Sequence, residues 1–229
     1  KNKIIKKIYF PSKEVTYNKL NQIFNKNKFK FKDIEKILFC SVVPKSFNLI
    51  KKFLAKKTNI KCYEVKNLNL KSLIKVKVDY KQVGSDRITN AISVMDHKNN
   101  FIILDFGTAT TFDVLVKNIY YGGIIAPGVK LSLNTLSDRA TLIPKIDLKK
   151  ITKVVGNNTI TAVRSGFFWG YAGLIDNIIN LIKKETRKTF KVNITGGFSG
   201  LFKNSIKTKV IQNQDITFKG LIKISRLIK

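Results

Sequence analysis

The sequence is poor in the residues that build disulfide scaffolds and transition-metal sites. Its 229 residues include two cysteines, Cys40 and Cys62, and one histidine, His97. Two cysteines cannot form a framework of several disulfides, and a structural zinc site takes about four Cys or His ligands. We therefore expect a protein of the reducing cytoplasm in which both thiols serve as small apolar side chains.

Glycine, proline and long apolar runs are also scarce. The chain has 13 Gly and 4 Pro, which excludes collagen-like and low-complexity structure. No stretch reaches the roughly 18 consecutive apolar residues of a membrane span, and lysines interrupt the opening segment before it forms a secretory signal. Hydrophobic residues at 44% suffice for a buried core, so we expect one large or two small folded domains and no membrane partner.

Acidic residues are few, because 14 Asp and Glu face 44 Lys and Arg, for a net charge of +30. Such an excess normally indicates nucleic acid or acidic membrane as a partner. Only five of the 44 are arginine, however, and Arg is the better ligand for phosphate and base edges. Codon bias in an A+T-rich genome is one explanation, and a polyanion-binding role is the other. In both cases we expect nucleic acid to bind only nonspecifically and in a salt-sensitive way.

Apolar spacing alternates between strand-like and helix-like along the chain, which predicts an α/β fold. The predicted strands cover 3–12, 36–43, 61–65, 120–128, 193–197 and 208–211. The predicted helices cover 17–27, 44–57, 85–95, 159–184 and 218–228. The run 100–118 predicts a two-stranded hairpin. The pattern restarts after the polar segment 96–100, which divides the chain into halves 1–98 and 99–229.

The segment DFGTATT (105–111) carries the strongest chemical signal. Asp105 ends a buried strand, Gly107 permits a tight turn, and hydroxyls follow at Thr108, Thr110 and Thr111. Backbone N–H groups and hydroxyls at such a turn can hold phosphate oxygens, and the carboxylate can hold a cation. The alternative is an ordinary hairpin with an Asp turn, although so many polar groups at the end of a buried strand are costly without a ligand.

A second signal is GSDR (84–87) at a predicted helix start. Ser85 or Asp86 can be a plain N-cap. In the functional interpretation Asp86 is a base and Arg87 clamps an anion.

Glycines mark further turns at Gly122-Gly123, Gly128 and TGG (195–197), where each is either a simple turn or a close approach to a ligand. Three more glycines lie at helical spacing and form a small face that predicts close helix packing, including packing at a dimer interface: Gly166, Gly170 and Gly173.

Taken in order, these motifs resemble those of the type III pantothenate kinases. The resemblance rests on GSDR (84–87), DFGTATT (105–111), GGIIAPG (122–128), NTITAVRSG (158–166) and TGG (195–197), and it extends from about residue 3 to residue 228. It implies the superfamily of acetate and sugar kinases, Hsp70 and actin, with two ribonuclease-H-like halves that are each a mixed sheet flanked by helices. It also implies a homodimeric transferase that phosphorylates pantothenate with ATP, Mg2+ and K+ or NH4+, in the first step of coenzyme A biosynthesis.

The resemblance also implies roles for individual residues. Asp86 would accept the proton of the pantothenate hydroxyl, and Asp105 would hold the monovalent metal ion or ammonium. The remaining roles are pantothenate binding by Gly84, Ser85, Asp86, Arg87 and Thr159, and ATP binding by Gly107, Thr108, Gly196 and Gly197.

Three features depart from the family pattern. Ser85 replaces an alanine, and Lys77 stands where a tyrosine usually contacts substrate, with Tyr80 nearby, so that role is not carried over. Members begin with an Asp-x-Gly-Asn-Thr hairpin that binds ATP phosphates, and no Asp-x-Gly precedes Asp105 here. We therefore expect the first half to lack its N-terminal hairpin, and residues 1–229 alone to bind ATP poorly and turn over little or not at all.

Two other functions stay open at this point. One is a degenerate, non-catalytic member that acts as a nucleic-acid-associated regulator, for which the charge leaves room. The other is a different small-molecule kinase of the superfamily. The intact GSDR and DFGTATT segments favour the pantothenate kinase, because a binding module need not keep a base and a cation site.

Overall fold

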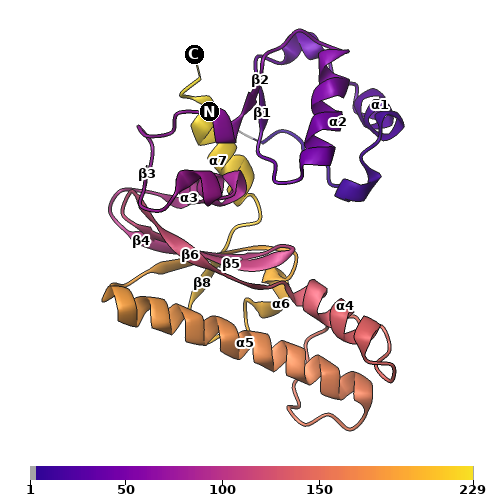
Figure 1. Cartoon of the computed structure of the whole chain (residues 1–229), viewed down its shortest axis with the longest axis vertical. Coiled ribbons are helices and arrows are strands. Elements are labelled where there is room, and N and C mark those ends of the chain that lie inside the picture. Colours follow the sequence, from indigo (N-terminus) through magenta and orange to yellow (C-terminus); the bar gives the residue numbers. More distant parts are fainter. Residues whose placement is uncertain (1–3, 229) are drawn as a thin grey trace. The chain divides into compact units, whose positions relative to one another are not determined.

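The computed structural model describes residues 4–228, which form two compact units (Figure 1). The first unit contains the chain up to Leu73, Asp79–Ser93 and the residues from Thr217 onward, and the second contains Ile74–Val78 and Val94–Ile216. The division into halves 1–98 and 99–229 stays a prediction. The compact units differ from it because segment 74–78 groups with the later residues and the C-terminal segment with the earlier ones.

The first unit combines helices with a small parallel sheet. Its regular elements are η1 (Ser12–Glu14), α1 (Tyr17–Lys26), η2 (Phe31–Asp33), β1 (Ile37–Phe39), α2 (Pro44–Ala55), β2 (Cys62–Glu64), η3 (Val65–Asn67), η4 (Tyr80–Gln82), α3 (Ser85–Val94) and α7 (Ile216–Ser225). Thr16 caps α1 by accepting the backbone N–H of Lys19 at 3.1 Å, and Pro44 opens α2. The four helices predicted for this unit are confirmed.

The strand predicted over 3–12 is wrong for the described part of that range. Residues 4–11 pair with no strand, and η1 follows them; position 3 lies outside the described residues. Phe10 packs instead against the core cluster built on Leu20, Phe53 and Leu54. The strand predicted over 36–43 is shortened to β1, because its three residues are the ones with partners in β2.

The second unit is built on a six-stranded mixed sheet in the order β3-β6-β5-β4-β7-β8. The elements are β3 (Lys75–Val76), β4 (Asn100–Phe106), β5 (Ala109–Val116), β6 (Ile119–Pro127), α4 (Val129–Arg139), α5 (Thr159–Thr186), β7 (Lys191–Gly196), α6 (Ser199–Phe202) and β8 (Val210–Gln212). Strands β4, β5 and β6 form an antiparallel meander, and β7 and β8 run parallel beside β4. The sheet is mixed and is flanked by helices, so the predicted α/β class is confirmed.

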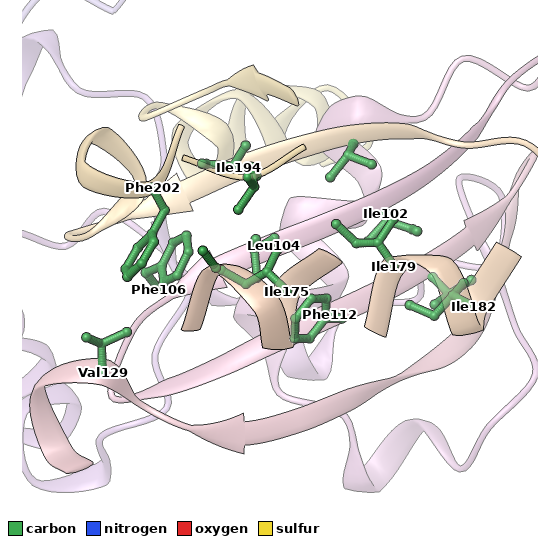
Figure 2. Packing of buried hydrophobic residues seen from close by; sticks show 14 of the residues in the cluster. Ile102, Leu104, Phe106, Phe112, Val129, Ile175, Ile179, Ile182, Ile194 and Phe202 are labelled. Atoms are coloured by element: carbon green, nitrogen blue, oxygen red, sulfur yellow. The ribbon is translucent and has the colours of Figure 1, made fainter. Parts of the chain in front are cut away.

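Helix α5 covers one face of this sheet (Figure 1). Its buried side chains recur every three or four residues, at Phe168, Ala172, Ile175, Ile179 and Ile182, and form one apolar stripe. The stripe packs against alternate residues of the neighbouring strands, among them Ile102, Leu104, Phe112 and Ile194, as Figure 2 shows. Asn158 and Thr161 form a capping box at the start of α5, in which Asn158 Oδ1 accepts the Thr161 N–H at 2.9 Å.

The predicted hairpin over 100–118 is confirmed as β4 and β5, and the long helix over 159–184 is confirmed as α5. Among the strands and α-helices of the described residues, β3, α4 and α6 were not predicted, and neither were the four short 3-10 helices η1 to η4. The glycine face of α5 packs against nothing in residues 4–228, because a β-carbon built on Gly166, Gly170 or Gly173 would meet no atom of that range within 4 Å.

Candidate active site

Asp105 lies in a row of oxygen-bearing side chains near the end of β4. It is directly opposite Thr111 of β5 and in register with Thr195 of β7. Residues paired across neighbouring strands present their side chains on the same face of a sheet, so one carboxylate stands between two hydroxyls. This set consists entirely of oxygen donors, which is the chemistry that binds hard cations.

The pairing of β4 with β5 places the three hydroxyls of DFGTATT in different surroundings. Thr110 lies opposite Phe106, whose ring stacks on Phe202 in the core, and Thr110 is fully buried. Thr108 is exposed at the tip of the turn between β4 and β5. Thr108 can therefore reach a ligand from the turn and Thr111 from beside Asp105, whereas Thr110 belongs to the core.

The Pro127-Gly128 turn packs directly on the hairpin tip. A β-carbon built on Gly128 would lie 1.9 Å from the carbonyl oxygen of Thr108, so no other residue fits without displacing the backbone. The Gly107 N–H donates to the Ala109 carbonyl at 3.1 Å and closes the turn itself. Gly128 thus packs directly against the Gly107–Thr108 turn. Of the two roles considered for this glycine, close packing within the chain is the one that the structure shows.

The Gly196–Gly197 turn is fixed to the end of β4. Gly196 has φ of +85°, and a β-carbon there would lie 2.5 Å from the Phe106 carbonyl oxygen. The Gly197 N–H donates to that same oxygen at 3.1 Å. The structure therefore brings Asp105, the Gly107–Thr108 turn and the Gly196–Gly197 turn to neighbouring strand ends of the second unit.

Thr159 is the first residue of α5 and is exposed. Its side chain makes no hydrogen bond within residues 4–228, and the hydrogen bonds of this helix start are made by Asn157, Asn158 and Thr161. The structure does not join Thr159 to the residues around Asp105.

In the first unit, GSDR begins α3. The Asp86 carboxylate folds back over Gly84, since a β-carbon on Gly84 would lie 2.5 Å from Asp86 Oδ1. The same oxygen accepts the Arg87 backbone N–H at 2.8 Å, which leaves Oδ2 with no hydrogen bond inside the described part of the chain. Asp86 therefore combines the helix-start role with an oxygen that can accept a hydrogen bond from a ligand.

A hydroxyl and thiol network fixes the start of α3 to the segment after β1. Ser85 Oγ donates to the Ser41 carbonyl at 3.3 Å, and Thr89 Oγ1 donates to the Ser85 carbonyl at 2.7 Å. Cys40 Sγ lies 3.3 Å from Thr89 Oγ1, and burial raises the pKa of this thiol. Ser85 thus has a structural use here. A pocket of about 280 Å³ adjoins it, lined by Ser41, Val42, Pro44, Phe47, Glu64, Lys66, Gly84 and Ser85.

Lys77, which stands where the family usually has a tyrosine, lies over an aromatic ring. Lys77 Nζ lies 4.0 Å from the ring centroid of Tyr121, which is cation–π geometry. Tyr80 is half-buried in η4, and burial raises the pKa of its hydroxyl. The structure gives neither residue a contact that defines a substrate role.

Sequence reasoning did not single out Ser199, which lies two residues after Gly197. Its hydroxyl donates to the Gly196 carbonyl at 2.8 Å and is fully buried. A serine that follows a Gly-Gly pair at this distance is a weak signal, so the sequence alone could not have found it.

Within the described residues, the ligands of a cation at Asp105 cannot come from a cluster of metal-binding side chains. Residues 4–228 hold no group of three or more His, Cys, Asp or Glu placed to bind a metal, so such a cation would need hydroxyl, carbonyl or water oxygens as its other ligands. None of the helices in that range is both long enough and apolar enough to cross a bilayer.

The structure resembles that of a protein from Campylobacter jejuni described as a conserved putative Baf family transcriptional activator, with a TM-score of 0.53 and 22% identity over 90% of this chain and 87% of that one. At this identity the likeness shows a shared fold alone, in agreement with the mixed α/β architecture described above.

The family follows from the similarity of this sequence to known proteins. The family model of the type III pantothenate kinases matches residues 5–181. The chain is 65% identical to the type III pantothenate kinase of Pelagibacter ubique over 100% of its own length and 92% of that protein. It is 36% identical to the enzyme of that name from Syntrophotalea carbinolica, over 83% of this chain and 76% of the relative. The chain belongs to the type III pantothenate kinase family.

Proposed function

We propose that this protein transfers the γ-phosphoryl group of ATP to the primary hydroxyl of pantothenate, which gives 4'-phosphopantothenate and ADP in the first step of coenzyme A biosynthesis. The observation that carries the proposal is the grouping of Asp105, the Gly107–Thr108 turn and the Gly196–Gly197 turn at the ends of β4 and β7 in a chain of this family.

The two turns are the proposed ATP-binding elements. The exposed Thr108 would hold phosphate oxygens through its hydroxyl, and Gly196 and Gly197 would border the nucleotide, where the missing side chains permit close approach. Phosphoryl transfer passes through a loose transition state, so positioning and charge neutralisation supply most of the rate.

Asp105 is the proposed ligand of K+ or NH4+, with Thr111 and Thr195 beside it in the sheet. The oxygen donors present fit a hard monovalent cation, and its charge would help to neutralise the phosphates. Mg2+ would enter with ATP as its phosphate-bound counterion.

On the pantothenate side, Asp86 is the proposed proton acceptor. Its Oδ2 is the oxygen available to the substrate hydroxyl, which it would orient as the oxygen attacks the γ-phosphorus, and it would take the proton as the new P–O bond forms. Arg87 would clamp the substrate carboxylate, and Gly84, Ser85 and Thr159 would complete the contacts with pantothenate.

We further propose that the enzyme is a cytoplasmic homodimer. The glycine face of α5 (Gly166, Gly170 and Gly173) has open space above it, and Trp169 on the same helix is 37% exposed. Small residues permit close approach of a second helix, and an exposed aromatic is enriched at protein interfaces. Nucleic acid would bind only nonspecifically, through the +30 charge, and would dissociate as salt is raised to physiological strength.

A coupled ADP-release assay tests the reaction, with pantothenate, acetate and common sugars offered in parallel to the full-length protein. The expected result is ADP release with pantothenate alone, and a product heavier than pantothenate by one phosphoryl group. Release with acetate or a sugar but not with pantothenate would assign a different small-molecule kinase. Release with none of them, together with DNA binding that persists at physiological salt, would support the regulator.

A further inference from the structure

We infer that Ser199 is a positioning residue for nucleotide binding, because its hydroxyl fixes the Gly196–Gly197 turn through a closed set of hydrogen bonds with two glutamines from β8 and the segment after it. The inference rests on the proposed function, in which that turn borders ATP. Ser199, Gln212 and Gln214 all lie in the second unit.

The hydrogen-bonding capacity of Ser199 is fully used. A serine hydroxyl has one proton to donate and two lone pairs to accept with. Ser199 Oγ donates to the Gly196 carbonyl at 2.8 Å and accepts from Gln212 Nε2 at 3.2 Å and from Gln214 Nε2 at 2.8 Å. Because the two amides fill both lone pairs, the proton is directed to Gly196 and to no other acceptor.

The bonded carbonyl belongs to a glycine with a positive φ. Gly196 adopts φ of +85° and has no side chain to hold it there, and glycine loses more conformational freedom on folding than any other residue. Its neighbour Gly197 is tied on the opposite side, where its N–H donates to the Phe106 carbonyl. The turn is therefore bonded on one side to β4 and on the other to Ser199.

The arrangement links β8 to the turn without a contact between Ser199 and the ligand. Ser199 is fully buried, so it cannot touch a nucleotide and acts through Gly196. Loss of its hydroxyl frees the Gly196 carbonyl and the two amides together, and the turn can then adopt other conformations. Only the fraction of molecules with the correct turn binds nucleotide, so the apparent affinity falls by that fraction.

The test compares Ser199→Ala with Ser205→Ala in the full-length protein. Ser205 follows α6 and donates to the Leu201 carbonyl at 3.5 Å, so it controls for loss of a nearby serine hydroxyl. Binding of a fluorescent ATP analogue and the KM values for ATP and pantothenate are measured for each. We expect Ser199→Ala to raise the Kd of the analogue and the KM for ATP about two- to tenfold, with the KM for pantothenate within about twofold, as loss of one net hydrogen bond predicts.

Gln214→Met provides a second variant at an exposed position, and its result decides the matter if Ser199→Ala fails to fold. It removes one amide donor and should raise the Kd of the analogue by about twofold. Equal nucleotide affinity in Ser199→Ala and Ser205→Ala, or equal rises in both KM values, would overturn the inference. A parent protein that binds the analogue but does not phosphorylate pantothenate would overturn the proposed function instead, and the binding constants of the variants would still decide the role of Ser199.

Discussion

The carboxylate of Asp105 occupies the space into which a side chain at Gly196 would project: a β-carbon built on Gly196 would lie 2.6 Å from Asp105 Oδ1. The proposed cation ligand and the proposed nucleotide turn therefore depend on each other, since a change at one position displaces the other.

Gly196→Ala should damage both stability and nucleotide binding. The alanine would be strained at φ of +85° and would collide with Asp105 and the Phe106 carbonyl, so we expect a loss of about 1–3 kcal/mol in the free energy of unfolding. Urea unfolding measures this loss. Gly197→Ala is the matched control, because a β-carbon there meets no atom within 4 Å, and it should change stability by less than about 0.5 kcal/mol. Equal losses in the two variants would contradict the close contact.

Asp86→Asn should lose most of the turnover. Removal of a general base typically costs about 10²–10⁴-fold in rate, and the amide keeps an oxygen that can accept the Arg87 N–H, so the start of α3 should survive. Steady-state kinetics of the full-length protein measure kcat, with Asp33→Asn as an exposed control in the same unit. An Asp86→Asn enzyme within a few-fold of the parent would remove this carboxylate from the mechanism.

Activity should require K+ or NH4+ and be weak in Na+ alone. Asp105→Asn removes the charge from the proposed cation site, so the K+ concentration for half-maximal activity should rise while Mg2+ dependence stays the same. ADP release is titrated with each chloride salt at constant ionic strength. Full activity of the parent in a buffer that contains Mg2+ but neither K+ nor NH4+ would refute the assignment of Asp105.

Asp96 should make the stability of the protein pH-dependent in acid. The backbone N–H and the side chain of Asn99, with the Lys98 N–H, hold the pKa of Asp96 at about 2, below its ordinary value of 3.8. Because the folded pKa is the lower one, ionised Asp96 stabilises the fold above about pH 4, and this contribution is lost as the pH falls through about 2.

Asp96→Asn therefore should have a lower Tm than the parent at pH 5 to 7, and the difference should shrink below pH 4. Thermal unfolding at a series of pH values measures this. A Tm difference that is independent of pH would show that the charge of Asp96 does not stabilise its hydrogen bonds with Lys98 and Asn99.

The elements that the sequence predicted correctly are those whose local pattern agrees with their tertiary setting. Two apolar runs separated by a polar turn gave the β4–β5 hairpin, and apolar residues every three or four positions gave α5. Helix α4 was missed because its apolar residues give an ambiguous pattern: Val129, Leu131 and Leu133 alternate as in a strand, whereas Val129, Leu133 and Leu136 have helical spacing. The strand expected near the beginning failed because a strand depends on a partner, which the pattern of one segment cannot provide.

The candidate site also has features that the local sequence predicts and features that it does not. Asp105 and Thr108 were singled out from residue types next to one another in the sequence, whereas the nucleotide role of Gly196 and Gly197 came from the resemblance to the family. The pairing of β4 with β7 brings the two segments together. The buried position of Thr110 and the bonds of Ser199 depend on strand register and on glutamines 13 and 15 residues away. Such long-range relations leave no local pattern.

The six-stranded sheet ends in its two shortest strands, β3 with two residues and β8 with three. An exposed sheet edge is a template on which another chain can add a strand and aggregate, and natural proteins limit this with short edges and lysines. Exposed lysines stand at both edges, Lys75 and Lys77 on β3 and just after it, and Lys207 and Lys209 just before β8. Because like charges repel, we expect these four exposed lysines to oppose the pairing of a second copy with either edge strand. Replacement of these lysines by neutral residues would therefore shorten the time that the protein stays monodisperse when concentrated, with no change in its fold.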